Sequence, residues 1–297
     1  MKIDTHTALQ WRDLAVEAGR SWQSDGAPSM GAALAFYTLF SMAPLLLLAI
    51  SIAGIAIGTD TARAMLMTQL TSLMGEQGAG AVRSMLEAGD AKSEGIWSAV
   101  VSVVTLVIGA STVFAELRRD LDKIWKFEAP ASAGVWSFIR SRLLSVGMVA
   151  TIGFLLMVSL AVSAAVAAFG SMWAGGFPGS AFVLRTLEFA GSFVVITGLF
   201  AMIYKILPSV RIAWGDVWVG AAVTSLLFWI GKFLIGIYLG RSAIASPFGA
   251  AGTLVVVIVW VYYSAQIFFL GAEFTRAYAL RLGSLRDKKP VSDIQPA

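Results

Sequence analysis

Cysteine is absent from this chain, and histidine occurs once, as His6. The first absence excludes a disulfide framework, a thiolate metal site and a cysteine nucleophile. A single histidine leaves no cluster of the ligands that zinc and related catalytic metals use. The sequence also contains no Gly-rich phosphate loop ending in Lys-Ser/Thr, as an ATP-driven pump requires. We therefore expect a protein that is not an enzyme and holds no cofactor or metal.

Charged residues are also scarce. Charged residues make up 13% of the sequence, against about 25% in ordinary soluble domains, and hydrophobic residues make up 58%. This composition excludes a water-soluble globule. The net charge of +4 is not gathered on a soluble basic face but lies beside apolar runs, so it indicates membrane topology and no nucleic-acid partner.

Long apolar runs are abundant, and each membrane-spanning helix needs roughly 20 apolar residues. The runs predict an all-α membrane bundle of six transmembrane helices, forming a single domain over residues 1–280. The expected spans are 32–57, 96–115, 143–168, 182–207, 216–239 and 252–272.

Basic residues predict the orientation, because Lys and Arg concentrate on the cytoplasmic side of a membrane. Sixteen of them fall in the segments on one side of the six spans and five on the other. We therefore expect both termini in the cytoplasm of a bacterium, with a polar cytoplasmic tail at 281–297, and the protein in the inner membrane.

Two segments outside the spans have helical patterns of their own. The first, 9–22, predicts an amphipathic helix that either lies in the membrane interface or packs on the bundle. The second, 59–94, predicts an extracytoplasmic hairpin of two amphipathic helices divided at "GEQGAG". The start of the chain lacks the pattern of a cleavable signal peptide, so we expect the first span to stay in the mature protein.

The first span, "GAALAFYTLFSMAPLLLLAISIAG", has a proline in its middle. In a bilayer such a residue is tolerated where neighbouring helices or hydroxyl groups satisfy the freed backbone carbonyl. We expect Pro44 to kink this helix.

Ionisable residues inside a span cost about 2.5 to 3.5 kcal/mol at a helix centre and are functional candidates for that reason. Lys232 in span five and Glu188 in span four are expected at similar depth, with Arg185 one turn away. On one interpretation, these three residues approach one another or share a water-filled cavity. On the other, Lys232 extends its stem toward the interface and Glu188 pairs only with Arg185.

A charged motif, "FAELRRDLDKIW", follows span two and places Glu116, Arg118 and Arg119 near the inner face. The motif is either an anchor with internal ion pairs or a site for an anionic lipid head group. Glu273, after span six, is expected to pair with Arg276 or with this basic loop.

Three blocks of the sequence resemble the YihY/BrkB family of bacterial inner-membrane proteins, formerly labelled ribonuclease BN. They are "GAALAFYTLFSMAPLLL", "YKILPSVRIAWGDVWVGAAVTSLLFWIGKFLIGIYL" and "VVIVWVYYSAQIFFLGAEF". Where that family has Tyr-Pro before the basic loop, this chain has Leu207 and Pro208. The resemblance implies six spans. The residues argue against the ribonuclease label, because no cluster of metal ligands or catalytic acids is evident outside the membrane.

The resemblance also implies a role in moving lipids or lipopolysaccharide precursors, and buried charges suit an anionic amphipathic cargo. We therefore expect a transporter or flippase-like protein with membrane lipids as partners. The expected contacts with the cargo are Arg118, Arg119, Arg142 and Arg211 at the inner face and Lys232 midway. The alternative is a non-transporting scaffold that affects envelope integrity.

Overall fold

The computed structural model describes residues 5–90, 112–127, 180–241 and 252–286. Within these ranges every regular element is a helix, and no strand occurs. The predicted all-α class is therefore confirmed for the described part of the chain.

Three long apolar helices come from the second half of the chain: α6 (Ser180–Ile206), α7 (Trp214–Arg241) and α8 (Gly252–Arg281). Each contains a stretch long and apolar enough to cross a membrane. Among the described residues these stretches are Phe189–Ile206, Trp214–Leu239 and Leu254–Arg281.

The predicted spans correspond to these helices only in part. The spans at 182–207 and 216–239 match α6 and α7 to within two residues at each end, whereas α8 continues nine residues beyond the predicted end at 272. The spans at 96–115 and 143–168 lie almost wholly outside the described residues. The count of six and the orientation of the termini therefore stay predictions.

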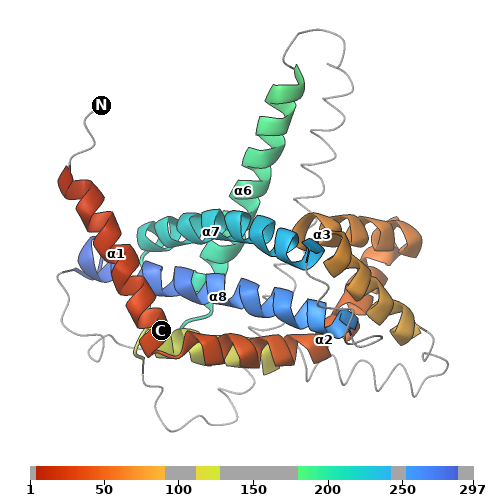
Figure 1. Cartoon of the computed structure of the whole chain (residues 1–297), viewed down its shortest axis with the longest axis horizontal. Helices are drawn as coiled ribbons and strands as arrows, with labels where there is room; N and C mark the ends of the chain where they lie inside the picture. The colour runs from red at the N-terminus through yellow and green to blue at the C-terminus, as the bar shows by residue number, and fades with distance from the viewer. Residues whose placement is uncertain (1–4, 91–111, 128–179, 242–251, 287–297) are drawn as a thin grey trace.

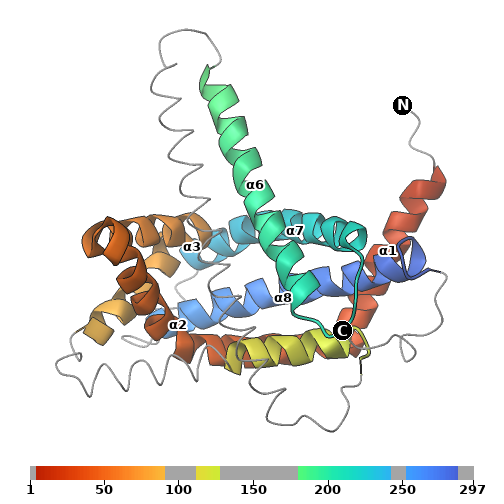
Figure 2. The ribbon, with the colours of Figure 1, turned by 180° about the vertical axis from the view of Figure 1, so that it is seen from behind.

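Helix α8 lies at the centre of the described structure. It contacts α7 and α1 as well as α2 (Ala27–Ile57) and α3 (Thr59–Asp90). In Figure 1, α2, α7 and α8 run alongside one another, with α1 at one end of them and α3 at the other. Helix α6 packs on α7 at a steep angle, and its N-terminal end extends beyond the other described helices (Figure 2).

Helix α1 (Thr5–Ser24) is joined to α2 by a tight turn. Gly26 has a φ of 77°, a conformation that a residue without a Cβ adopts at little cost. Pro28 follows in the first turn of α2, where its missing N–H is not needed. Helix α2 covers the predicted first span and continues as one helix through Pro44. The kink predicted at Pro44 stays a prediction.

The amphipathic pattern of α1 is satisfied by packing on the bundle. Leu14 and Ala18 are buried in a cluster with Phe274 and Ala277 of α8. Trp11 stacks on Phe274 with ring centroids 6.0 Å apart. Of the two interpretations of this segment, the structure shows the packed helix, which is longer than the predicted 9–22. These contacts also explain why α8 continues beyond the predicted end of the sixth span at 272.

Helix α3 consists of two helical halves that meet at Gly75, where φ is 74° and ψ is 175°. Two helical halves thus meet at the first residue of "GEQGAG", and the extracytoplasmic position of this hairpin stays a prediction. Its buried Val82 and Leu86 share a cluster with Ile235 near the end of α7 and Val257 near the start of α8. The hairpin thus covers the end of the bundle opposite to α1.

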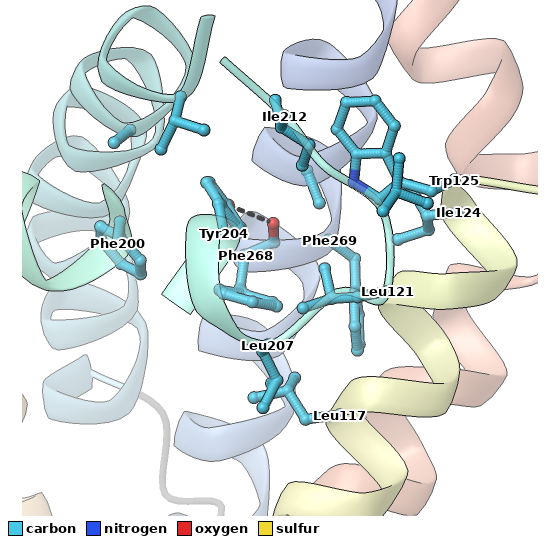
Figure 3. Close-up of a cluster of buried hydrophobic side chains, with 14 of the residues drawn as sticks. Leu117, Leu121, Ile124, Trp125, Phe200, Tyr204, Leu207, Ile212, Phe268 and Phe269 are labelled. Carbon is cyan, nitrogen blue, oxygen red and sulfur yellow. Dashed lines mark hydrogen bonds between the residues drawn. The ribbon is translucent and has the colours of Figure 1, made fainter. Parts of the chain in front are cut away.

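Glycines allow α7 and α8 to approach closely. A Cβ on Gly220 would lie 1.9 Å from the Thr275 hydroxyl oxygen, and one on Gly271 would lie 2.0 Å from that of Thr224. At the same level, the buried Tyr204 hydroxyl of α6 donates to the Phe268 carbonyl oxygen at 2.7 Å and lies 3.1 Å from the Thr224 hydroxyl (Figure 3). This contact joins three helices.

Candidate functional site at the polar end of the bundle

A helix at residues 112–124 carries the charged motif "FAELRRDLDKIW" to the end of the bundle where α1 lies. Its buried face presents Leu121, Ile124 and Trp125 to a cluster that includes Phe269 of α8 and Leu207 at the end of α6 (Figure 3). Because this apolar face is buried, the charged residues of the motif lie around it, against the neighbouring segments.

The first polar group joins this helix to the loop after α6. Arg118 donates a hydrogen bond to the Ser209 hydroxyl at 2.9 Å. Asp122 accepts from the Ser209 backbone N–H at 2.6 Å and from its hydroxyl at 2.8 Å, and lies 3.8 Å from Arg118. Burial raises the pKa of Asp122, and the two bonds from Ser209 and the Arg118 charge oppose that rise. Arg118, a predicted cargo ligand, is thus part of an internal network.

Two other residues of the motif form a surface pair. Arg119 contacts Glu116 at 2.6 Å, one turn apart on the same helix, with the Arg119 side chain largely exposed. Arg211 is exposed in the loop before α7. Arg142 lies outside the described residues. Binding of a cargo by these four arginines stays a prediction.

Asp120 is the buried carboxyl of the motif, with one oxygen that receives no hydrogen bond. Burial, together with the negative charge of Glu116, raises its pKa to about 6. The nearby Arg119 and Lys123 offset part of this rise. The sequence analysis did not single this residue out, because the periodicity of the motif does not show which of its acids faces inward.

A second polar group lies deeper, between the α1–α2 turn and α8. Glu273 is fully buried and lies 3.9 Å from Arg276, the partner expected for it. Asp25, also buried, contacts Lys126 and lies within hydrogen-bonding reach of Glu273. Lys126 follows the charged motif and pairs with Asp25, while the ion pair that the structure gives Glu273 is the one with Arg276.

Two further contacts close the same end. Asp216, in the first turn of α7, accepts bonds from the Ser284 hydroxyl at 2.6 Å and its N–H at 3.0 Å. Arg281 contacts Glu17 of α1 at 2.5 Å. Leu285 is buried as well, so the first residues of the predicted polar tail pack on the bundle.

Lys232 lies half-buried in α7, and no hydrogen bond or ion pair joins it to another described side chain. The side chains of Glu188 and Arg185 are outside the described set, so their predicted meeting with Lys232 stays a prediction. Phe189, next to Glu188, packs edge-on against Trp229 with centroids 5.2 Å apart. Since Trp229 is one turn before Lys232, this contact places the two backbone positions in the same region.

The polar end is chemically an interlocking set of ion pairs and hydrogen bonds between segments far apart in the chain. Asp25, Ser209, Asp216 and Ser284 were all missed as functional candidates. The count of basic residues could have indicated them, because all segments assigned to the cytoplasmic side must lie at the same end of the bundle and can contact one another there.

The chain is similar to known membrane proteins over most of its length. The model of the family described as "Virulence factor BrkB" matches residues 18–295. A UPF0761 membrane protein of Verminephrobacter eiseniae is 26% identical over 269 residues, which cover 89% of this chain and 62% of that protein. One from Pseudoalteromonas translucida is 25% identical over 246 residues, covering 82% and 78%.

A third relative, from Pseudomonas aeruginosa, is 25% identical over 253 residues, covering 84% of this chain and 58% of that protein. The chain thus spans about three fifths of the length of several curated relatives. No solved structure matches. The apolar helices and these relatives are consistent with the bacterial inner membrane, and the extent of the family match shows that the chain is a membrane protein of the BrkB virulence factor family.

Proposed function

We propose that this protein moves an anionic amphipathic lipid within the membrane, with Lys232 as the cation that attracts its head group. The observation that carries the proposal is a lysine inside an apolar helix with no partner among the described side chains. A charge in that position is costly, and intramembrane charges usually mark a substrate pathway.

The surroundings of Lys232 suit a lipid reached from the side. On the same helix Trp229 and Phe233 are 44% and 65% exposed, so the apolar surface beside the lysine faces outward. Acyl chains would contact this surface while the ammonium group meets the phosphate. Among the predicted inner-face ligands, the exposed Arg211 is the best placed to receive the head group, since Arg118 is engaged by Asp122 and Ser209.

A scaffold without transport is the second candidate, and the polar end of the bundle favours it. Arg118, Asp122, Asp216 and Glu17 are all used in contacts between segments. Because these contacts join several segments at one end of the bundle, that end is expected to be rigid, as a scaffold requires. Under either candidate we propose no enzymatic step and no nucleic-acid partner.

Reconstitution separates the two candidates. Vesicles containing the full chain would be loaded with phosphatidylglycerol carrying a dithionite-quenchable fluorophore, and the rate of exchange between leaflets measured. We expect protein-dependent exchange that falls about tenfold in Lys232→Leu, the equivalent of about 1.4 kcal/mol, and persists in Lys232→Arg. Labelled phosphatidylcholine serves as the neutral-lipid control.

The outcomes are distinct. No exchange above protein-free vesicles would reject transport of this lipid class and favour the scaffold. Equal exchange by the native protein and Lys232→Leu would remove Lys232 from the mechanism.

A further inference from the structure

The contact between Asp25 and Glu273 brings two carboxyl groups together inside the protein, and we call these two residues the carboxyl pair. The Glu273 side chain is 0% exposed, and Asp25 is 7% exposed. They belong to different parts of the fold, the α1–α2 turn and α8. Two ionised carboxylates this close in a region that excludes water repel each other strongly.

Three of the four carboxyl oxygens of the pair have no hydrogen-bond donor among the described residues. Neither oxygen of Glu273 accepts a hydrogen bond, and Oδ2 of Asp25 accepts none either. Each buried acceptor without a donor costs about 1 to 3 kcal/mol, more if it is charged. A single donor placed between the two side chains would satisfy atoms of both.

The charged neighbours show which acid lacks compensation. Asp25 is in contact with Lys126 through Oδ1, so a positive charge lies directly beside it. Glu273 has only Arg276, at 3.9 Å, beyond hydrogen-bonding distance. Among the described residues, the charged groups that act on Glu273 are Asp25, Lys126 and Arg276. The residues of α1 and α7 that cluster near this stretch of α8 are apolar and include Leu14, Ala18, Val219 and Val223.

We propose that the carboxyl pair is a proton-binding site, with one proton carried by Glu273 and donated to Asp25. The proton removes the charge of Glu273, gives Oδ2 of Asp25 a donor, and leaves one negative charge facing Lys126. A hydrated metal ion suits the site less well, because the Lys126 ammonium already occupies Asp25 and only two carboxylates converge there. The proposal is independent of any cargo.

Whether this site holds its proton would affect the packing of the α1–α2 turn against α8. Loss of the proton puts two negative charges between the α1–α2 turn and α8, and so weakens the seating of α1 on the bundle.

The sign of the pH dependence follows from the site. An unfolded glutamate binds a proton only below a pH of roughly 4.3. Between that pH and the pH at which the pair releases its proton, the folded protein binds more protons than the unfolded chain. Stability therefore falls as pH rises through this window.

Infrared difference spectroscopy of the full chain in nanodiscs tests the site. Spectra recorded over a pH series in the Asp120→Asn background, which removes the other buried acid with a raised pKa, should contain the C=O band of a protonated carboxyl that disappears as pH rises. Glu273→Gln should abolish this band and remove the matching part of the pH dependence of thermal stability. Asp13→Asn, at an exposed carboxylate on α1 paired with Arg12, is the matched control and should retain both.

If Glu273→Gln does not fold, Asp25→Asn decides, because a proton on Glu273 that loses its anionic acceptor must shift its band. An unchanged band in the variant tested would overturn the proposal. So would the absence of any such band from the native protein, which would indicate an ionised pair bridged by water.

Discussion

Single residues in this protein acquire their properties from the segment that covers them, as the two buried acids of the polar end show. Asp122 and Asp120 lie two positions apart on one helix. Asp122 receives two bonds from Ser209, while one oxygen of Asp120 has no donor. The same residue type therefore has its buried oxygens bonded at one position and one of them left without a donor at the other.

Replacing Asp120 should change the pH dependence of stability. Its pKa is raised from 3.8 to about 6, so the folded protein binds the extra proton between these values and loses stability as pH rises through them. Asp120→Asn, compared with the native protein, should gain nothing near pH 4 and up to about 3 kcal/mol above pH 7. Unfolding in mixed micelles at both pH values measures this difference.

The exposed Asp13→Asn variant is the control for this measurement, and its stability should match the native protein at both pH values. A gain for Asp120→Asn that is equal at pH 4 and pH 8 would show that titration of Asp120 is not the cause.

At the scale of elements, local sequence predicted where helices are but not how far they extend. Gly75 opens the "GEQGAG" segment where a division was predicted, and its positive φ is one that glycine adopts at little cost. The end of α8 was predicted too early, since the apolar run stops at Ala272. The helix continues because α1 supplies a second surface for it to pack on.

The α7–α8 contact should be sensitive to one methyl group. In Gly271→Ala the new Cβ would lie 2.0 Å from the Thr224 hydroxyl oxygen and 2.7 Å from that of Tyr204. The helices must separate or the hydrogen bonds must break, at a cost of about 1 to 3 kcal/mol or more. Unfolding in mixed micelles would show this loss.

Gly236→Ala on α7 is the matched control, since nothing lies within 4 Å of its added Cβ. Helix propensity predicts a gain of up to about 1 kcal/mol for it. Equal effects of the two substitutions would show that close packing is not what requires Gly271.

At the scale of the whole molecule, the described segments sort to two ends. The α1–α2 turn, the 112–124 helix, the loop before α7 and the end of α8 are joined at one end. The α3 hairpin packs at the other. This is the partition that the basic-residue count requires, although the partition alone does not say which end is cytoplasmic.

The absence of cysteine allows a direct test of sidedness. Gln23→Cys at the end of α1 and Glu87→Cys on α3 each place one thiol at an exposed position. In intact spheroplasts a membrane-impermeant maleimide should label Glu87→Cys, and it should label Gln23→Cys only after lysis.

The reverse pattern would invert the orientation. Labelling of both thiols in intact spheroplasts would show that the two ends do not lie on opposite sides of the membrane.

The sequence alone determined that most of this chain is in lipid, that it is helical, and roughly where helices begin, because solvation cost and backbone preference act on neighbouring residues. Only the tertiary structure decided which charges are partnered. Asp25 meets Lys126 across 101 positions and Asp122 meets Ser209 across 87, and such contacts depend on how helices pack rather than on local pattern. For that reason the contact of Arg118 with Ser209 and the meeting of Asp25 with Glu273 could not be predicted from the sequence.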